Sequence, residues 1–258
     1  MHAVILAGGE EKSNSPLYEL AQGGNKSFLD IAGKPMLQWT IDAVAAAEQI
    51  DHLHVIGIEE NSGIQVEKPL SFLADQGSML ANIVAGVEWV HQQDPSAGHV
   101  LLASGDIPAL TPDIVDWRIS AGLEKDVDID YAVVDRSVME KRFPGSNRSY
   151  IRLKDCEVCG GDLNLVHVKV VKDRDLWERL VAARKNAFKQ AALVGWDVLL
   201  LLLLRQLTLA NAELRVCRNL DITGHATLSP YAEVAMDVDK PHQLEILRQD
   251  LGRTRIEA

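Results

Sequence analysis

Cysteine is scarce in this chain of 258 residues, which has only Cys156, Cys159 and Cys217. Three cysteines make no disulfide framework, and a reducing compartment is the simplest setting for them. Cys156 and Cys159 have the spacing of a metal-binding pair, but the sequence contains no second pair, so we do not expect structural zinc. No signal-peptide pattern precedes the first apolar run, and we therefore expect a cytoplasmic protein.

Positive charge is also in short supply, because 26 Lys and Arg oppose 37 Asp and Glu and the net charge is −11. This balance argues against a partner such as nucleic acid or an anionic membrane, since there is no basic excess to neutralise phosphates. Any phosphate site must then be a local cluster of basic residues.

Long apolar runs are absent as well. The most apolar run, Leu199–Leu204, is bracketed by Asp197 and Arg205 and is too short to span a bilayer. We expect a buried helix here. Because six successive leucines cannot share one face, this helix should be covered on most sides or should contact a partner subunit, which leaves a homo-oligomer open.

The apolar residues that are present follow two periods. Runs rich in β-branched residues predict strands, and apolar positions three and four apart predict helices. The strands are expected at 3–7, 53–58, 70–73, 100–103, 129–134, 165–171, 225–228 and 233–238. The helices are expected at 36–48, 79–90, from 112, at 175–184, 196–209, 210–220 and from 241.

Over the first half of the chain these strands and helices alternate at the spacing of βαβ units. This alternation predicts an α/β fold with a mainly parallel sheet. We find no internal repeat and no linker, so we expect a single domain over residues 1–258 with a helical subregion at about 174–220.

The amino-terminal strand is followed by Gly8 and Gly9, and Lys26 comes after a polar loop. Glycine lets a ligand approach the backbone N–H groups closely, and open α/β sheets bind ligands at the carboxyl ends of their strands. With a lysine nearby, this stretch suits an anionic ligand such as a nucleotide phosphate. The alternative is an ordinary turn with a solvated lysine.

Three aspartates lie at or near the ends of predicted strands, namely Asp106, Asp237 and Asp239. Carboxylates at adjacent strand ends can hold Mg²⁺ when substrate phosphates supply its other ligands. Alternatively, Asp106 bonds its own turn and Asp239 caps the helix that begins at Pro241. We favour metal binding because the aspartates occur together with the amino-terminal loop.

A basic, turn-rich insertion over residues 142–154 carries Arg148 and Arg152 in an otherwise acidic chain. Arginine forks match phosphate oxygens, so this insertion is either an anion-binding face or a solvated loop. After it, Gly161 can permit close backbone approach and Asn164 can hydrogen-bond a substrate hydroxyl. The alternative for these two residues is a β-bulge.

Taken together, the chain resembles the nucleotidyltransferase superfamily, and within it the molybdenum-cofactor guanylyltransferase-like NTP transferases. The resemblance implies a glycosyltransferase A-type fold, a Rossmann-like three-layer sandwich. The blocks that carry it are Leu6-Ala7-Gly8-Gly9, Asn25-Lys26, Gly33-Lys34-Pro35-Met36-Leu37, Gly105-Asp106-Ile107-Pro108 and Asp237-Val238-Asp239-Lys240-Pro241.

The resemblance also implies a reaction. An oxygen of a phosphorylated acceptor attacks the α-phosphorus of a nucleoside triphosphate, most simply GTP or CTP, and pyrophosphate leaves. An ionised phosphate needs no general base, so catalysis consists of positioning and charge neutralisation. Lys26 and Asp106 would be catalytic, and Asp106 and Asp239 would hold Mg²⁺.

The same resemblance distributes the binding residues. Lys12 stands where the superfamily has an arginine on the triphosphate. The other residues expected at the nucleotide are Leu6, Ala7, Gly8, Gly9, Lys26, Gln76, Gly77, Ser78 and Asn82. Those expected at the acceptor are Arg148, Arg152, Gly161 and Asn164.

Two other functions stay open. Asp237-Val238-Asp239 is formally an Asp-x-Asp motif, which a glycosyltransferase that uses a nucleotide-sugar would share. A nucleotide-binding module without catalysis is the other, because Glu10-Glu11-Lys12 replaces the usual arginine loop. The acceptor and the base are not fixed by the sequence.

Overall fold

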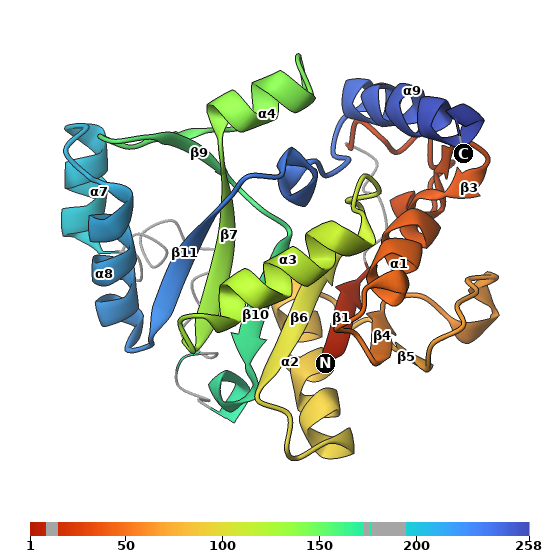
Figure 1. Ribbon diagram of the computed structural model, residues 1–258, viewed down its shortest axis with the longest axis horizontal. Coiled ribbons are helices and arrows are strands. Elements are labelled where there is room, and N and C mark those ends of the chain that lie inside the picture. The colour runs from red at the N-terminus through yellow and green to blue at the C-terminus, as the bar shows by residue number, and fades with distance from the viewer. Residues whose placement is uncertain (9–14, 173–175, 177–194, 258) are drawn as a thin grey trace.

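The computed structural model describes residues 1–8, 15–172, 176 and 195–257. A nine-stranded sheet runs through the molecule, with the strand order β5-β4-β1-β6-β10-β7-β9-β8 and with β11 paired to β7 (Figure 1). Its strands are β1 (His2–Leu6), β4 (His52–Ile56), β5 (Leu70–Leu73), β6 (His99–Ser104), β7 (Ile129–Asp135), β8 (Ile151–Arg152), β9 (Glu157–Gly160), β10 (Leu163–His167) and β11 (Gly224–Ser229). A separate two-stranded sheet pairs β2 (Asp30–Ile31) with β3 (Lys34–Pro35).

The centre of the large sheet is parallel, as the alternation of strands and helices predicts. β1 lies between β4 and β6 and pairs with both in parallel, and β5 extends this part beyond β4. β10 enters antiparallel between β6 and β7, and β9 and β8 follow antiparallel at the edge. The sheet is therefore mixed, with a parallel core.

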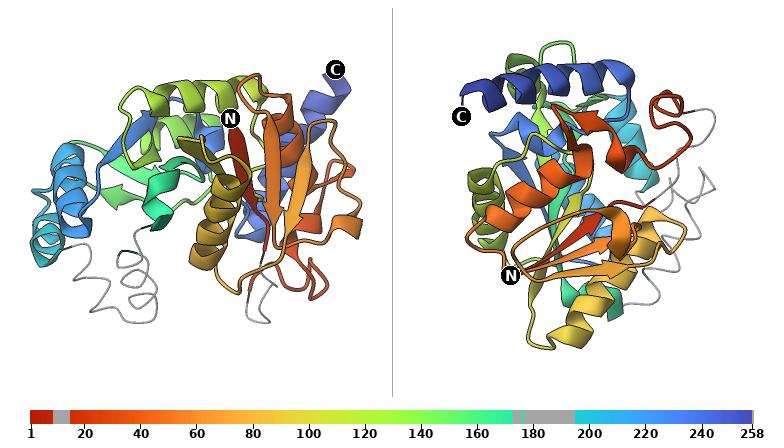
Figure 2. Two further views of the ribbon diagram at one scale, coloured as in Figure 1. Left: turned by 90° about the horizontal axis from the view of Figure 1, so that it is seen from below. Right: turned by 90° about the vertical axis from the view of Figure 1, so that its right-hand side faces the viewer.

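Helices cover both faces of the sheet (Figure 2). The larger apolar core lies between the sheet and α1, α3 and α9, and a smaller one lies on the opposite face beneath α2. The α-helices are α1 (Met36–Ala46), α2 (Met79–Gln93), α3 (Pro112–Leu123), α4 (Arg136–Arg142), α7 (Trp196–Leu203), α8 (Leu209–Leu220) and α9 (Pro241–Glu257). This arrangement is the three-layer α/β sandwich expected from the sequence.

Two predicted strands are wrong in part. The strand expected over 165–171 is β10, which ends at His167 and continues as a 3-10 helix over Val168–Lys172. The strand expected over 233–238 is a 3-10 helix over Ala232–Ala235 followed by irregular backbone. The second segment bonds to loops instead of a neighbouring strand, because Val238 donates to the carbonyl of Asp106.

The leucine run is not the buried helix that its composition predicts. α7 ends at Leu203, and Leu200, Leu203 and Leu204 are 57%, 80% and 58% exposed, whereas Val198 is buried. The helix lies at the edge of the molecule beside α8 (Figure 1), so among the described residues it packs mainly on α8. The expected helix over 175–184, within the subregion at about 174–220, falls almost entirely outside the described residues. Within the part that the structure describes, no helix is long and apolar enough to cross a bilayer.

Candidate functional site

A pocket of about 360 Å³ opens at the carboxyl ends of β1 and β6. The parallel pairing of these strands places Leu6 beside Ser104, so the loops that follow them start side by side. The antiparallel strand β10 begins at the same edge, where the backbone carbonyl of Asp162 accepts a hydrogen bond from the backbone N–H of Ser104 at 2.9 Å. The pocket is lined by Leu6, Ala7, Gly8, Asn25, Lys26, Ser27, Met79, Asn82, Ser104, Gly105, Asp106, Asp162, Asp237 and Asp239.

Close backbone contact shapes the rear of this pocket. A Cβ on Gly57 would lie 2.0 Å from the Cα of Gly8, and Gly57 has a φ of +99°, so only glycine fits there. A Cβ on Gly8 would in turn meet the side-chain amide of Asn82 at 2.9 Å. The sequence analysis did not single out Gly57, which lies within the strand predicted over 53–58 and directly follows β4 in the structure.

Asn25 fixes the position of the lysine that follows it. Its side chain donates to the carbonyl of Ala7 at 2.7 Å and accepts from the N–H of Ser27 at 2.9 Å, which caps the 3-10 helix Lys26–Phe28. A segment eighteen residues beyond the first strand is thereby tied to the end of that strand. This is the physical reason why Asn25-Lys26 belongs to the site.

The ammonium group of Lys26 lies between two carboxylates. Its Nζ is 2.7 Å from Asp106, 3.0 Å from Asp239 and 2.9 Å from the carbonyl oxygen of Val238. Burial by itself would lower the pKa of Lys26, but the charges of Asp106 and Asp239 and the hydrogen bonds to them outweigh burial and raise it above its ordinary value. Lys26 is therefore a permanent cation at neutral pH.

Three carboxylates, here called the acidic cluster, lie close together in this pocket, namely those of Asp106, Asp237 and Asp239. One carboxylate oxygen from each lies within 4.8 Å of the others. Asp106 is oriented by the hydroxyl of Ser104, which donates to it at 2.6 Å. The separation is small enough for one cation to contact all three, so the proximity expected for Asp106 and Asp239 is present.

Asp162 is a fourth carboxylate in this pocket, and the sequence analysis missed it. Burial, followed by the negative charge of Asp106, raises the pKa of Asp162 to about 7. The sequence offers one signal, since Asp162 follows Gly160-Gly161 directly and precedes a strand. Only an antiparallel β10 brings it to this edge, and the sequence predicts no such orientation.

Arg148 reaches the site from the basic insertion. Its guanidinium forms an ion pair with Asp237 and lies 4.0 Å from Asp162. Its side chain is 13% exposed, and its buried Nε has no hydrogen-bond partner among the described residues. Arg148 thus stands beside the acidic cluster, on the side of Asp237.

Arg152 is not brought to the pocket. Its guanidinium pairs with Glu157 at 3.2 Å between β8 and β9, where its side chain is 58% exposed. Gly161 and Asn164 are used within the protein, because Asn164 accepts from the N–H of Ala132 at 2.8 Å and donates to the carbonyl of Gly161 at 3.1 Å. These bonds are closer to the bulge alternative than to free acceptor-binding groups.

The loop before α2 is held by a pair of polar side chains. Asn82 is buried, accepts from the N–H of Gln76 at 2.7 Å and donates to Asp75 at 2.9 Å. Asp75 also accepts from the N–H of Gly77 at 2.9 Å, and Ser78 caps the helix. The sequence analysis did not predict Asp75 as a site residue, but its side chain holds the predicted loop 76–78 in place. Two other predicted residues, Gly9 and Lys12, lie outside the described residues.

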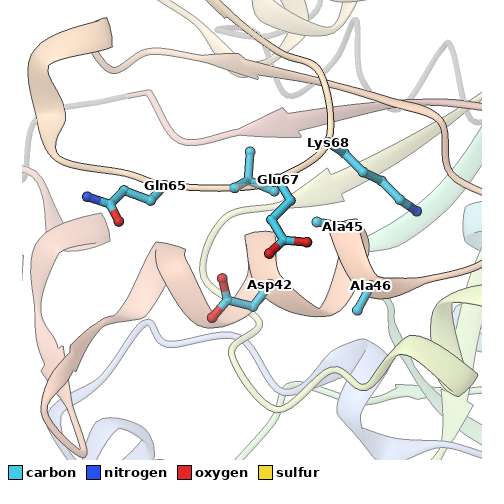
Figure 3. A pocket seen from close by; sticks show the side chains of 7 residues that line it. Asp42, Ala45, Ala46, Gln65, Glu67 and Lys68 are labelled. Atoms are coloured by element: carbon cyan, nitrogen blue, oxygen red, sulfur yellow. The ribbon is translucent and has the colours of Figure 1, made fainter.

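A second groove, about 480 Å³ in volume, lies between α1 and the segment before β5 (Figure 3). Asp42 and Glu67 point into it, but Asp42 already pairs with Lys34 at 2.5 Å. Lys68 donates to the carbonyls of Ala47 and Ile50, each at 2.6 Å. Asp42 and Lys68 thus serve the local fold, so the pocket at β1 and β6 is the stronger candidate for catalysis.

Known proteins resemble this chain in sequence and in fold. The family model of the MobA-like NTP transferase domain matches residues 3–198. A solved structure described as a hypothetical transferase from Thermus thermophilus is 36% identical, covers 94% of this chain and 98% of its own, and superposes with a TM-score of 0.80. Solved nucleotidyltransferases at 12% and 14% identity share the fold, with TM-scores of 0.59 and 0.54.

Curated relatives match over a shorter region. A probable molybdenum cofactor guanylyltransferase of Thermococcus gammatolerans is 30% identical over 120 residues, which is 46% of this chain and 56% of that protein. The 2-C-methyl-D-erythritol 4-phosphate cytidylyltransferase of Thermosynechococcus vestitus is 29% identical over 124 residues, 45% of this chain and 49% of that protein. The chain thus spans about half the length of these relatives. Because the family model covers well over half of the chain, this protein belongs to the family of MobA-like NTP transferase domains.

Proposed function

We propose that this protein is a nucleotidyltransferase that transfers a nucleoside monophosphate from an NTP to a phosphorylated small molecule. The observation that carries the proposal is Lys26 fixed between Asp106 and Asp239 at the carboxyl ends of two parallel strands. Open α/β sheets bind ligands at this edge, and a partly buried cation beside carboxylates is suited to a metal–phosphate complex. The relatives named above are guanylyl- and cytidylyltransferases, which supports the reaction class.

The residues fit a magnesium ion. Mg²⁺ prefers oxygen ligands at about 2.1 Å and is often held by one or two carboxylates together with substrate phosphates. The acidic cluster offers three carboxylates within 4.8 Å, of which Asp106 and Asp239 are our proposed ligands. When bound, the metal would neutralise charge on the phosphates.

In the proposed reaction, an oxygen of the acceptor phosphate forms a new bond to the α-phosphorus of the NTP. The bond from the α-phosphorus to the bridging oxygen breaks, and pyrophosphate leaves with that electron pair. Lys26 holds the α-phosphate and stabilises the charge that develops on it, and Asn25 keeps the lysine at the strand end. No proton transfer by the protein is needed.

We propose that the nucleotide lies along Leu6, Ala7 and Gly8 and the loop 76–78. Asp75 and Asn82 hold that loop in place before any ligand arrives, which lowers the entropic cost of binding. The names of the relatives favour GTP or CTP. On the acceptor side, Arg148 is the predicted residue that the fold places nearest to the acidic cluster. The three free cysteines suit a reducing compartment, and we propose the cytoplasm.

The test is a thermal-shift screen of the four common NTPs with Mg²⁺, followed by an assay for released pyrophosphate. A nucleotide at a hundred times its Kd should add roughly 2.7 kcal/mol to the free energy of unfolding. Release of pyrophosphate in the presence of phosphorylated acceptors supports the proposal. Nucleoside diphosphate released from a nucleotide-sugar would show a glycosyltransferase instead, and binding without turnover on any acceptor would show a nucleotide-binding module.

A further inference from the structure

The two cationic side chains that contact the acidic cluster, Lys26 and Arg148, are already paired within the protein. The ammonium of Lys26 contacts Asp106 and Asp239, which are the two carboxylates proposed to hold the metal. The guanidinium of Arg148 contacts Asp237, the third member of the cluster, and approaches Asp162. Each cation thus bridges two carboxylates, and no member of the cluster is without a cationic partner.

This pairing conflicts with metal binding at the same carboxylates. An ion with ligand distances of about 2.1 Å that binds the same carboxylate oxygens as Lys26 must lie in the space that Lys26 Nζ enters at 2.7 Å from Asp106. Two like charges a few ångströms apart also repel strongly at a partly buried site. These oxygens therefore cannot hold the ammonium in its present position and a divalent cation at the same time.

The pairing conflicts equally with phosphate binding. A lysine whose ammonium bonds to two carboxylates and one carbonyl has no donor left for the α-phosphate. Arg148 differs in one respect, because its buried Nε lacks a hydrogen-bond partner among the residues described. Both side chains must leave the carboxylates before they can bind a substrate phosphate.

Resting on the function proposed above, we propose that Lys26 and Arg148 form a latch that closes the acidic cluster in the absence of metal. A divalent cation that binds the cluster takes their place and frees both side chains for substrate phosphates. Lys26 turns to the α-phosphate, and Arg148 turns to a phosphate of the second substrate. Metal binding and phosphate binding are then coupled through two side chains, and Arg148 is a phosphate-binding residue of the reaction.

The first test measures the release of Lys26 directly. The purified protein is acetylated briefly, with and without saturating Mg²⁺ and without nucleotide, and the labelling of each lysine is measured by mass spectrometry. Lys26 should be protected without metal and should become at least about threefold more reactive with it, because the ion pairs that protect it are broken. Lys34 is the matched control, since its ion pair with Asp42 lies outside the pocket and should not respond to metal.

The second test measures Mn²⁺ binding by electron paramagnetic resonance in the absence of nucleotide. Lys26→Met and Arg148→Met should each bind Mn²⁺ roughly fivefold more tightly than the wild type, because the competing cation is gone. Arg136→Met is the matched control, since Arg136 pairs with Glu157 at the surface and should leave Mn²⁺ affinity unchanged. With saturating Mg²⁺, Arg148→Met should also weaken the binding of phosphorylated substrates, whereas Arg148→Lys should restore part of it.

The outcomes separate the latch from the proposed function. If the wild type binds Mn²⁺ but the labelling of Lys26 is unchanged by metal, the latch is overturned and the metal site stands. If Arg148→Met binds Mn²⁺ as the wild type does, Arg148 is no part of the latch and its proposed phosphate role falls with it. If the wild type binds no divalent cation with or without nucleotide, the metal assignment within the proposed function fails as well.

Discussion

At the residue scale, the site is built from a few side chains, each of which makes several contacts. Asn25 caps a turn and ties it to the first strand, and Lys26 neutralises two carboxylates that would otherwise repel each other. Asp106 is oriented by Ser104 on the strand that precedes it. Because Lys26 and Asp106 line the pocket, changes to these two residues should affect binding and catalysis more than stability.

Lys26→Ala is expected to lower turnover about a hundredfold, once a substrate is known, while the protein stays folded. The loss of one charge-assisted contact in the transition state costs roughly 3 kcal/mol. Steady-state kinetics together with circular dichroism check this prediction. Lys34→Ala, which removes a lysine from an ion pair outside the pocket, should keep the wild-type rate. Wild-type turnover in Lys26→Ala would remove Lys26 from the mechanism.

Asp239→Asn should weaken the binding of Mg²⁺ with nucleotide more than Asp237→Asn does. Asp239 is 57% exposed at the pocket mouth and shares Lys26 with Asp106, whereas Asp237 is held by Arg148. Calorimetric titration of both variants with nucleotide and Mg²⁺ compares them directly. Equal losses would mean that the whole cluster holds the metal, and an unaffected Asp239→Asn would leave Asp239 with only a structural role.

At the scale of the elements, buried polar contacts fix how helices and strands meet. Arg118 of α3 is fully buried, forms an ion pair with Asp130 of β7 at 2.6 Å and donates to the carbonyl of Leu163 at 2.8 Å. The hydroxyl of Thr227 on β11 donates to the same aspartate. One ion pair therefore joins a helix to three neighbouring strands, beneath the sheet edge that carries the site.

Asp130→Ala is expected to lower the free energy of unfolding by about 3 to 5 kcal/mol, because it leaves a buried guanidinium without its counter-charge. Chemical denaturation followed by fluorescence measures the loss. Glu124→Ala, at an exposed position just after α3, should change the free energy of unfolding by no more than about 0.5 kcal/mol. A loss as small as this at Asp130 would mean that the pair adds no net stability.

In α7, substitution of an exposed leucine should have little effect on the free energy of unfolding. Leu203 is 80% exposed, so Leu203→Gln should change the free energy of unfolding by no more than about 0.5 kcal/mol. Val198 is 4% exposed, and Val198→Asp should cost about 3 kcal/mol because it buries an unpaired charge. Thermal denaturation at low protein concentration compares the two variants. A severe loss at Leu203 would mean that this face of α7 is covered.

At the scale of the whole molecule, stability should depend on pH through a stack of histidines between β1 and β4. The parallel register places His2 beside His52, and Nε2 of His54 lies 3.0 Å from Nδ1 of His2 in a hydrogen bond. Burial, followed by the charges of His2 and His52, lowers the pKa of His54 from 6.5 to about 4. His54 is therefore neutral in the folded protein at neutral pH.

Because the folded pKa of His54 lies below the unfolded one, the unfolded chain binds more protons between pH 4 and 6.5. Stability should thus fall as the pH drops through this window, by roughly 3 kcal/mol for this residue. Denaturation curves of wild type and His54→Gln isolate the effect, and the slope should be shallower in the variant. Asp162, whose pKa is raised to about 7, contributes the opposite slope to both proteins and cancels in the difference. Parallel curves would contradict the assignment.

Much of the fold could be predicted because many of its elements depend on the residue pattern within a single segment. The strands β1, β4, β6 and β7 and the helices α1 and α2 follow from apolar periodicity, which each segment carries in its own residues. The failed strand over 233–238 shows the limit of this reasoning. Its apolar residues are buried as a strand's would be, but the segment has no neighbouring strand to pair with.

The sequence by itself determined the residues whose position follows from one strand end: Gly8 and Asp106 lie at the site because parallel strands end at one edge. Only the tertiary structure determined that Asp162 and Arg148 lie at the site, since an antiparallel β10 and the path of an irregular loop bring them to it. It also decided that Leu200 and Leu203 of α7 face solvent. Local patterns record which side chains are apolar or charged, whereas pairing and burial depend on segments that meet only when the chain folds.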